Sequence, residues 1–166
     1  MAEDKKFIGL DVNGCRILTD AVCQIMDQFS EQSGEQIRFN DIEETGICFS
    51  NDQGSLILNE KENILGGFER RCSYPFFVVY RASRRDERQQ LAANWFLECL
   101  GLWLTGEDVV IGDPEKSKPI IIPALSDGRK ITKITRSMPY PTEPNQDGMQ
   151  DWILPVVVEY EHVKED

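Results

Sequence analysis

The hydrophobic pattern is most distinctive between residues 66 and 106, where it changes from the two-residue period of a strand to the period of a helix. In residues 74–82 apolar side chains occupy both alternating faces, which predicts an inner strand whose second face also needs cover. A capping box of Ser83 and Asp86 predicts where the next helix begins, and Gly106 predicts its end. The second half of this helix is apolar around most of its circumference.

One sheet cannot cover so much apolar surface, so either a thick core within the chain or a second subunit must bury the rest. We take a subunit contact as the sharper hypothesis. Its candidate residues are Trp95, Leu100 and Trp103 on the helix and Phe77 and Val79 on the strand.

The N-terminal part of the chain predicts one more helix and several short strands. Apolar residues at helical spacing indicate a helix that begins after Asn13 or Gly14 and ends at Gly34. Residues 36–60 hold three β-branched or aromatic stretches, with turn chemistry at residues 51–54. We interpret them as a meander with a hairpin.

The C-terminal part predicts mainly strands. Residues 120–122 and 131–136 form two short candidates on either side of an Asp127-Gly128 turn. The proline-rich residues 138–150, which include Tyr140, predict an extended loop. Residues 152–161 alternate cleanly as a last strand, followed by a short acidic tail, and Pro155 favours an edge position or a bulge.

Together these elements predict an α+β fold with a mainly antiparallel sheet and two helices packed on one side. A chain of 166 residues suits a single domain spanning 1–166.

The formal net charge of -11 argues against tight wrapping of nucleic acid. The five scattered cysteines predict free thiols in a reducing compartment, and we expect no leader, no membrane span and no bound metal or cofactor.

No known catalytic motif is present. The phosphate-binding loop GxxxxGK[ST] and the dinucleotide motif GxGxxG are absent, and the single histidine, His162, lies in an acidic stretch where we expect it to be solvated. We therefore assign no catalytic residue.

Two charged clusters remain, and each has two interpretations. Arg84, Arg85 and Arg88 form either a solvated helix start or a docking surface for an acidic partner. Asp41, Glu43 and Glu44 form either a solvated loop or a site for a cation or acid–base work.

Residues 66–103 resemble the tail-terminator or tail-completion proteins of long-tailed bacteriophages, often labelled minor capsid proteins. The similar features are the pair Gly67-Phe68, a strand with Phe76 or Phe77, Arg81 just past its end, and a helix that ends with Trp103. The same order continues with Pro119-Ile120, Pro123, Asp127-Gly128 and Tyr160, so the resemblance covers about two-thirds of the chain and the first helix.

The resemblance implies a structural virion subunit, assembled in the host cytoplasm, that closes into a homo-oligomeric, hexameric ring on the tail tube. The ring stops tail elongation and offers its other face to a head-completion or neck protein, while DNA passes through its lumen. Loops at 40–46, 51–54 and 138–150 are candidate contacts with neighbouring rings. The alternatives are a neck adaptor or minor capsid protein of the same particle, and a small cytoplasmic enzyme using the carboxylates around Asp41, Glu43 and Glu44.

Overall fold

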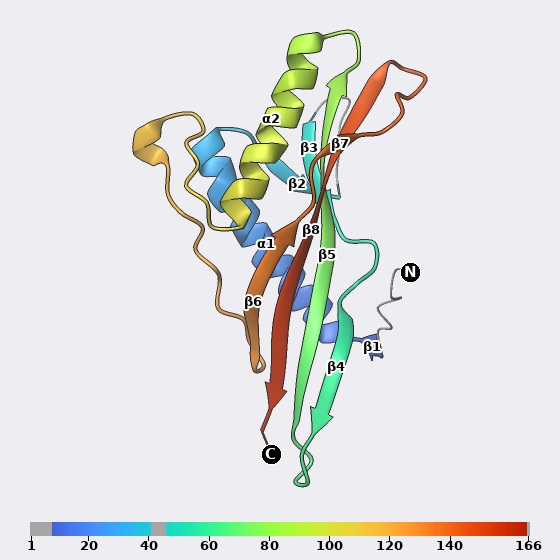
Figure 1. The fold of residues 1–166 in the computed structure, drawn as a ribbon, viewed down its shortest axis with the longest axis vertical. Helices are drawn as coiled ribbons and strands as arrows, with labels where there is room; N and C mark the ends of the chain where they lie inside the picture. The colour runs from blue at the N-terminus through green and yellow to red at the C-terminus, as the bar shows by residue number, and fades with distance from the viewer. Residues whose placement is uncertain (1–7, 41–45, 166) are drawn as a thin grey trace.

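The computed structural model describes residues 8–40 and 46–165 (Figure 1). Two helices lie on one side of one largely antiparallel sheet, which confirms the predicted α+β fold. The helices are α1 (Val12–Ser33) and α2 (Glu87–Leu104), with a short 3-10 turn η1 (Pro114–Lys116). The strands are β1 (Gly9–Leu10), β2 (Ile37–Phe39), β3 (Gly46–Ser50), β4 (Leu56–Glu62), β5 (Phe68–Ser83), β6 (Arg129–Arg136), β7 (Tyr140–Pro141) and β8 (Met149–Lys164).

Two long central strands organise the sheet. β5 and β8 have 16 residues each and pair antiparallel along their whole length, which gives the molecule its long axis (Figure 1). The other edge of β5 is covered by β4 and then β3, placed end to end, and the other edge of β8 by β6 and then β7. β1 adds to β4, and β2 adds to β3 in parallel. β5 is thus the inner strand that its two apolar faces predict.

A proline stands in each central strand where the outer neighbour changes. Pro75 lies between the part of β5 that pairs with β4 and the part that pairs with β3. Pro155 lies between the β6 and β7 segments of β8. A proline lacks the N–H that a ladder needs, so a break in the neighbouring strand tolerates it. The strand predicted over residues 74–82 would have Pro75 near its beginning, but β5 begins at Phe68 and Pro75 lies in its middle. The prediction that Pro155 marks an edge strand or bulge was also wrong, because β8 pairs with β5 in unbroken register there.

The predicted meander is also wrong. β3 and β4, joined by the turn at residues 51–54, do not pair with each other but both pair with β5. The Asn51 side chain explains the separation, because its amide donates to the carbonyl oxygens of Gly54 and Pro75 at 3.0 and 2.5 Å. These two bonds hold the turn at residues 51–54 beside Pro75, in the gap between β4 and β3.

Both helices begin at an aspartate. Asp86, not Ser83, caps α2 and accepts hydrogen bonds from the backbone N–H groups of Arg88 and Gln89. Ser83 is the last residue of β5. Asp11 caps α1 two residues earlier than predicted, whereas the predicted stop at Gly34 is confirmed by its left-handed φ of 76°.

The hydrophobic core fills the layer between the helices and one face of the sheet. Aromatic rings connect the elements there: Phe29 on α1 lies 5.4 Å from Phe96 on α2, and Phe96 lies 5.6 Å from Tyr80 on β5. The largest fully buried side chains are Leu18, Ile25, Met26, Phe29, Phe49, Tyr74, Phe76, Leu97, Leu100, Trp103, Leu154 and Tyr160.

Residues 120–122 form no strand, contrary to the prediction. Two glutamines one helical turn apart on α1 hold this segment extended instead. Gln28 both donates to the carbonyl of Ile121 (2.8 Å) and accepts from its N–H (2.9 Å). Gln32 makes the same pair of bonds with Lys118 at 2.9 and 3.2 Å. The side-chain amides of Gln28 and Gln32 thus make the backbone hydrogen bonds that a neighbouring strand would otherwise make with this segment.

The C-terminal segment is more regular than predicted. Within residues 138–150, Tyr140 and Pro141 pair with β8, and Met149 already belongs to β8, so the loop is shorter than expected. The supposed acidic tail is the end of β8, which continues to Lys164.

Candidate functional site

The face of the sheet opposite the helices carries an apolar belt. Pro75, Phe77 and Val79 on β5 stand in register with Val157, Pro155 and Ile153 on β8. All six side chains are half-buried, and in the described residues no helix covers this face. Neighbouring side chains on the same face shield one another, yet each ring or branch still presents area to solvent. We call these six residues the open-face belt.

Two features extend this belt sideways. The exposed Tyr140 on β7 pairs with Ile153 and so lies beside the belt on the same face. On the other side, a hollow of about 590 Å³ is lined by Leu10, Leu56 and Leu58 together with Pro75 and Val157 of the belt. The open face is therefore both apolar and concave, as surfaces that receive another protein often are.

Polar pairs bound the belt at each end. Arg81 and Asp151 form a two-pronged ion pair, with Nε–Oδ1 2.7 Å and Nη2–Oδ2 3.1 Å. At the other end, Ser73 stands opposite Glu159 and Arg71 opposite Glu161. An apolar centre with a polar rim is the usual anatomy of a protein–protein interface.

The structure separates the three predicted contact residues of α2. Leu100 and Trp103 are fully buried within one chain, so they are core residues and are not accessible to a partner. The Trp103 ring lies 5.2 Å from Phe29, and its indole N–H donates to the carbonyl of Lys118 at 2.8 Å. Trp95, in contrast, is 54% exposed. For most of this apolar helix the thick core is the correct explanation.

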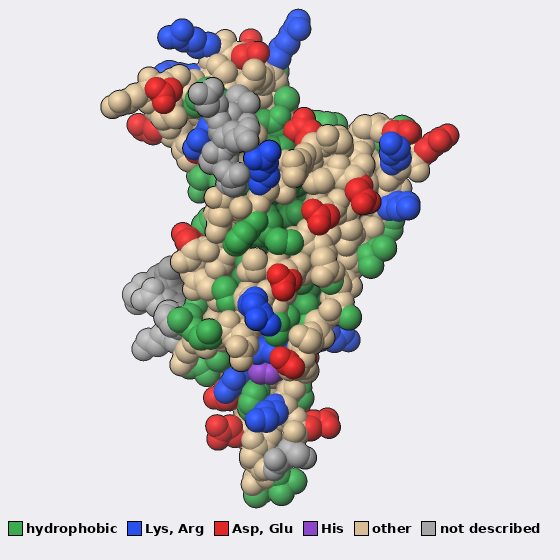
Figure 2. Space-filling model, turned by 180° about the vertical axis from the view of Figure 1, so that it is seen from behind, with side chains coloured by type: hydrophobic (Ala, Val, Ile, Leu, Met, Phe, Trp, Pro, Cys, Tyr) green, Lys and Arg blue, Asp and Glu red, His purple; other side chains and the backbone are tan. Residues whose placement is uncertain are grey.

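The three predicted arginines lie together at one end of the molecule. Arg84 and Arg85 are exposed in the turn after β5, and Arg88 is exposed in the first turn of α2. In the described part of the chain none of them forms an ion pair with a carboxylate. Figure 2 shows basic side chains projecting from this upper end.

The predicted carboxylate cluster of Asp41, Glu43 and Glu44 lies outside the described residues. Among residues 8–40 and 46–165, no group of three or more His, Cys, Asp or Glu side chains is placed to hold a metal ion. Neither helix of these residues has the length and apolarity needed to cross a membrane.

A buried polar cluster, which the sequence did not reveal, joins the start of α1 to the sheet. Asp11 accepts two hydrogen bonds from Arg129, Nε–Oδ2 3.0 Å and Nη2–Oδ1 2.7 Å, and one from the Tyr160 hydroxyl at 2.7 Å. Tyr160 also bonds to Ser55. A side chain at Gly14 would collide with the Asp11 carboxylate and lie 2.6 Å from the Tyr160 hydroxyl. The cluster thus requires glycine at this position.

The environment of this cluster shifts its pKa values in opposite directions. Burial disfavours the charged form of Asp11, but the bonds from Arg129 and Tyr160 outweigh it and lower the pKa of Asp11 to about 2. Burial raises the pKa of Tyr160. His162 is not the solvated side chain that we predicted, because it is half-buried with its ring 5.0 Å from that of Phe68. Burial, together with the nearby Arg129 charge, lowers the pKa of His162. The hydrogen bonds of the cluster tie the start of α1 to β6 and β8.

The end of the molecule opposite the arginines carries an exposed apolar tip. The β4–β5 hairpin projects there (Figure 1), and its turn residues Ile64 and Leu65 are 104% and 74% exposed. Figure 2, viewed from the side on which α1 lies, shows apolar side chains at this lower tip beneath a band of charged residues. The sequence signal was available: two apolar residues in a turn that ends with Gly66-Gly67.

Comparisons with known proteins identify no family. No protein-family model matches the chain, and no curated protein matches it. Among solved structures, the fold is similar to one chain of the virion of a native gene transfer agent (GTA) particle, with a TM-score of 0.48 and 14% sequence identity over 92% of this chain and 99% of that chain.

Proposed function

We propose that this protein is a structural subunit of a tailed, phage-like virion that closes into a ring on the end of the tail tube. The observation that carries the proposal is the open-face belt. The two helices bury one face of the central strands, and among the described residues no helix covers the other, apolar face, whose belt side chains are half-buried. Copies of the chain that pack over this face would remove it from water at about 25 cal/mol per Å².

The residue pattern described above supports the choice of ring. It resembles tail-terminator proteins across residues 66–103 and in the strands that follow. A ring needs a surface that contacts a different surface on the next copy, and the open-face belt and the exposed Trp95 offer surfaces of that kind. We take the ring to be hexameric, as the resemblance implies.

The two ends of the elongated molecule suit contacts with different rings. One end presents Arg84, Arg85 and Arg88, and the other presents Ile64 and Leu65. In the proposed particle one end contacts the last ring of the tube and the other contacts a head-completion or neck protein. The net charge of -11 lets DNA pass through the lumen without being held.

Mass photometry of the purified protein, alone and with tail tubes of its own particle, tests the proposal. We expect rings either in solution or at tube ends, and electron microscopy should place them at one end of each tube. A protein that stays monomeric in both conditions contradicts the proposal. Rings that bind isolated heads but not tubes favour a neck adaptor of the same particle instead.

A further inference from the structure

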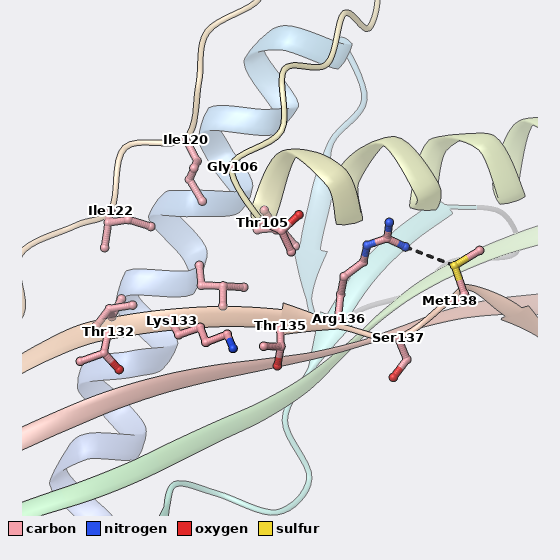
Figure 3. Close-up of a pocket in the computed structure, with 13 residues that line it drawn as sticks. Thr105, Gly106, Ile120, Ile122, Thr132, Lys133, Thr135, Arg136, Ser137 and Met138 are labelled. Carbon is pink, nitrogen blue, oxygen red and sulfur yellow. Dashed lines mark hydrogen bonds between the residues drawn. The ribbon is translucent and has the colours of Figure 1, made fainter.

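A large hollow runs along an edge of the sheet that no described strand pairs with. It has a volume of about 870 Å³ and is lined by residues 131–138, by the end of α2 at Leu104, and by Ile120 and Ile122 across from them. Figure 3 shows β6 forming one wall, with the two isoleucines on the opposite side and Arg136 pointing toward α2. We call this hollow the β6 groove.

The edge of β6 presents free backbone groups to the groove. Ser137 donates its N–H to the carbonyl of Pro155 at 3.0 Å, which fixes the phase of the β6–β8 ladder. In an antiparallel pair alternate residues bond to the neighbour, so Thr135 faces β8 while Ile134 and Arg136 direct their N–H and C=O groups outward. In the described part of the chain no strand pairs with this outer edge.

The groove has a mixed apolar and basic lining. Ile122 and Met138 supply exposed apolar side chains, the half-buried Ile120 lies beside them, and Lys133 and Arg136 supply positive charge in a chain of net charge -11. A free strand edge with such a lining fits an extended segment that has apolar and acidic side chains, added as a further strand.

The opposite edge of the same sheet offers such a segment. β1 covers only Leu56 and Ile57 of β4, so the outer edge of the rest of β4 is unpaired in the described residues. Asn63 donates to the carbonyl of Gly67 at 2.9 Å, and the same alternation then turns the backbone groups of Glu60 and Glu62 outward. The apolar hairpin tip follows directly.

We infer that the β6 groove receives the β4–β5 hairpin of a second copy of this chain, with β4 pairing antiparallel to β6. β6 and β4 run in opposite directions within one sheet, because β5 and β8 lie between them in a fully antiparallel order. Rotation about a ring axis preserves each strand's direction along that axis, so the edges of neighbouring copies meet antiparallel. The inference rests on the proposed ring and adds a contact between strand edges to the proposed contact over the open-face belt.

Amide hydrogen exchange at single-residue resolution tests this junction. In the isolated subunit the N–H groups of Ile134 and Arg136 should exchange freely, while that of Thr135, bonded to β8, is protected and serves as the internal control. In the assembled ring at least one of the two outward amides should slow by about tenfold or more. Rings in which both exchange as in the monomer overturn the inference and leave the proposed function standing. A chain that never assembles overturns both.

A charge reversal on each edge gives an independent readout. Glu62→Lys and Arg136→Glu should each raise the subunit concentration needed for assembly by about tenfold, because both side chains lie on the helix-covered face of the sheet and each reversal brings like charges together along the junction. Asp20→Lys, on the exposed face of α1, makes the same charge change as Glu62→Lys away from both edges and should assemble like the parent chain. Parent-like assembly of Glu62→Lys and Arg136→Glu counts against the junction.

Discussion

The two faces of the sheet differ in burial, and adjacent residues of β5 show the difference. Val78 is fully buried beneath the helices, whereas its neighbour Val79 is half-buried on the open face. Both are valines with similar β propensity, so local preference does not distinguish them. The covered face stabilises the single chain, and the apolar area of the open face remains available to stabilise an assembly. Four predictions test this division, from the largest expected effect to the smallest.

Trp103→Ala should cost about 3–5 kcal/mol of unfolding free energy, because it opens a large cavity in the covered layer and removes one of the two donors, Trp103 and Gln32, to the Lys118 carbonyl. Urea denaturation measures the loss. Trp95→Ala on the same helix is the matched control and should cost less than about 1 kcal/mol, since its ring is largely exposed. Equal costs for the two variants would remove the distinction between the faces of α2.

Acid should weaken the tie between α1 and the sheet. The folded pKa of Asp11 is lowered from 3.8 to about 2, so its contribution is fully present above pH 4 and is lost as the pH falls through 2. A shift of this size corresponds to about 2 kcal/mol. Denaturation at several pH values measures it, with Asp11→Asn as the comparison. We expect the stability difference between parent and variant to shrink over this pH window, and a constant difference would contradict the assignment.

Substituting threonine for the adjacent valines compares the two faces most directly. Val78→Thr buries a hydroxyl and should destabilise the monomer by about 1–2 kcal/mol, whereas Val79→Thr should change its stability by less than about 0.5 kcal/mol. The order should reverse for assembly, which Val79→Thr weakens about tenfold in mass photometry. If Val79→Thr leaves ring formation unchanged, the open-face belt is not the contact.

Reversing the charges of Arg84, Arg85 and Arg88 to glutamate should have the smallest effect on the subunit, less than about 0.5 kcal/mol, because all three are exposed. Docking to an acidic partner ring should weaken, and the parent's docking should fall more steeply with salt than that of the variant. Lys116→Glu, exposed in η1 away from this end, is the control. Docking that survives the triple reversal unchanged would exclude these arginines from the contact.

Periodicity predicted most of the regular elements. The stops of the helices and the alternation of β8 depend on neighbours only a few residues away, so the sequence was enough to find them. Pairing was harder: the turn at residues 51–54 has hairpin chemistry, yet Asn51 bonds across it to Pro75 and leaves β3 and β4 apart. A hydrogen bond between residues distant in sequence, such as Asn51 and Pro75, leaves no pattern among neighbouring residues from which it could be predicted.

The structure places the predicted contact residues in two layers. Phe77, Val79 and Tyr140 lie on the open face, where their contact with a partner stays a prediction, while Leu100 and Trp103 lie in the core. On a helix that is apolar around its whole circumference, a residue buried in the core and a residue that contacts a partner follow the same sequence pattern. Only the position of Phe29 and of the Lys118 carbonyl decides that Trp103 is enclosed.

By itself the sequence determined that a strand with two apolar faces leads into an apolar helix, because side chains alternate along a strand and recur every turn of a helix. It also determined the acidic charge and the absence of known catalytic motifs. Only the tertiary structure decided which face the helices cover, which edges remain unpaired, and that Asp11, Arg129 and Tyr160 meet in one cluster. The physical reason is that burial and pairing depend on residues far apart in the chain, and folding alone brings them into contact.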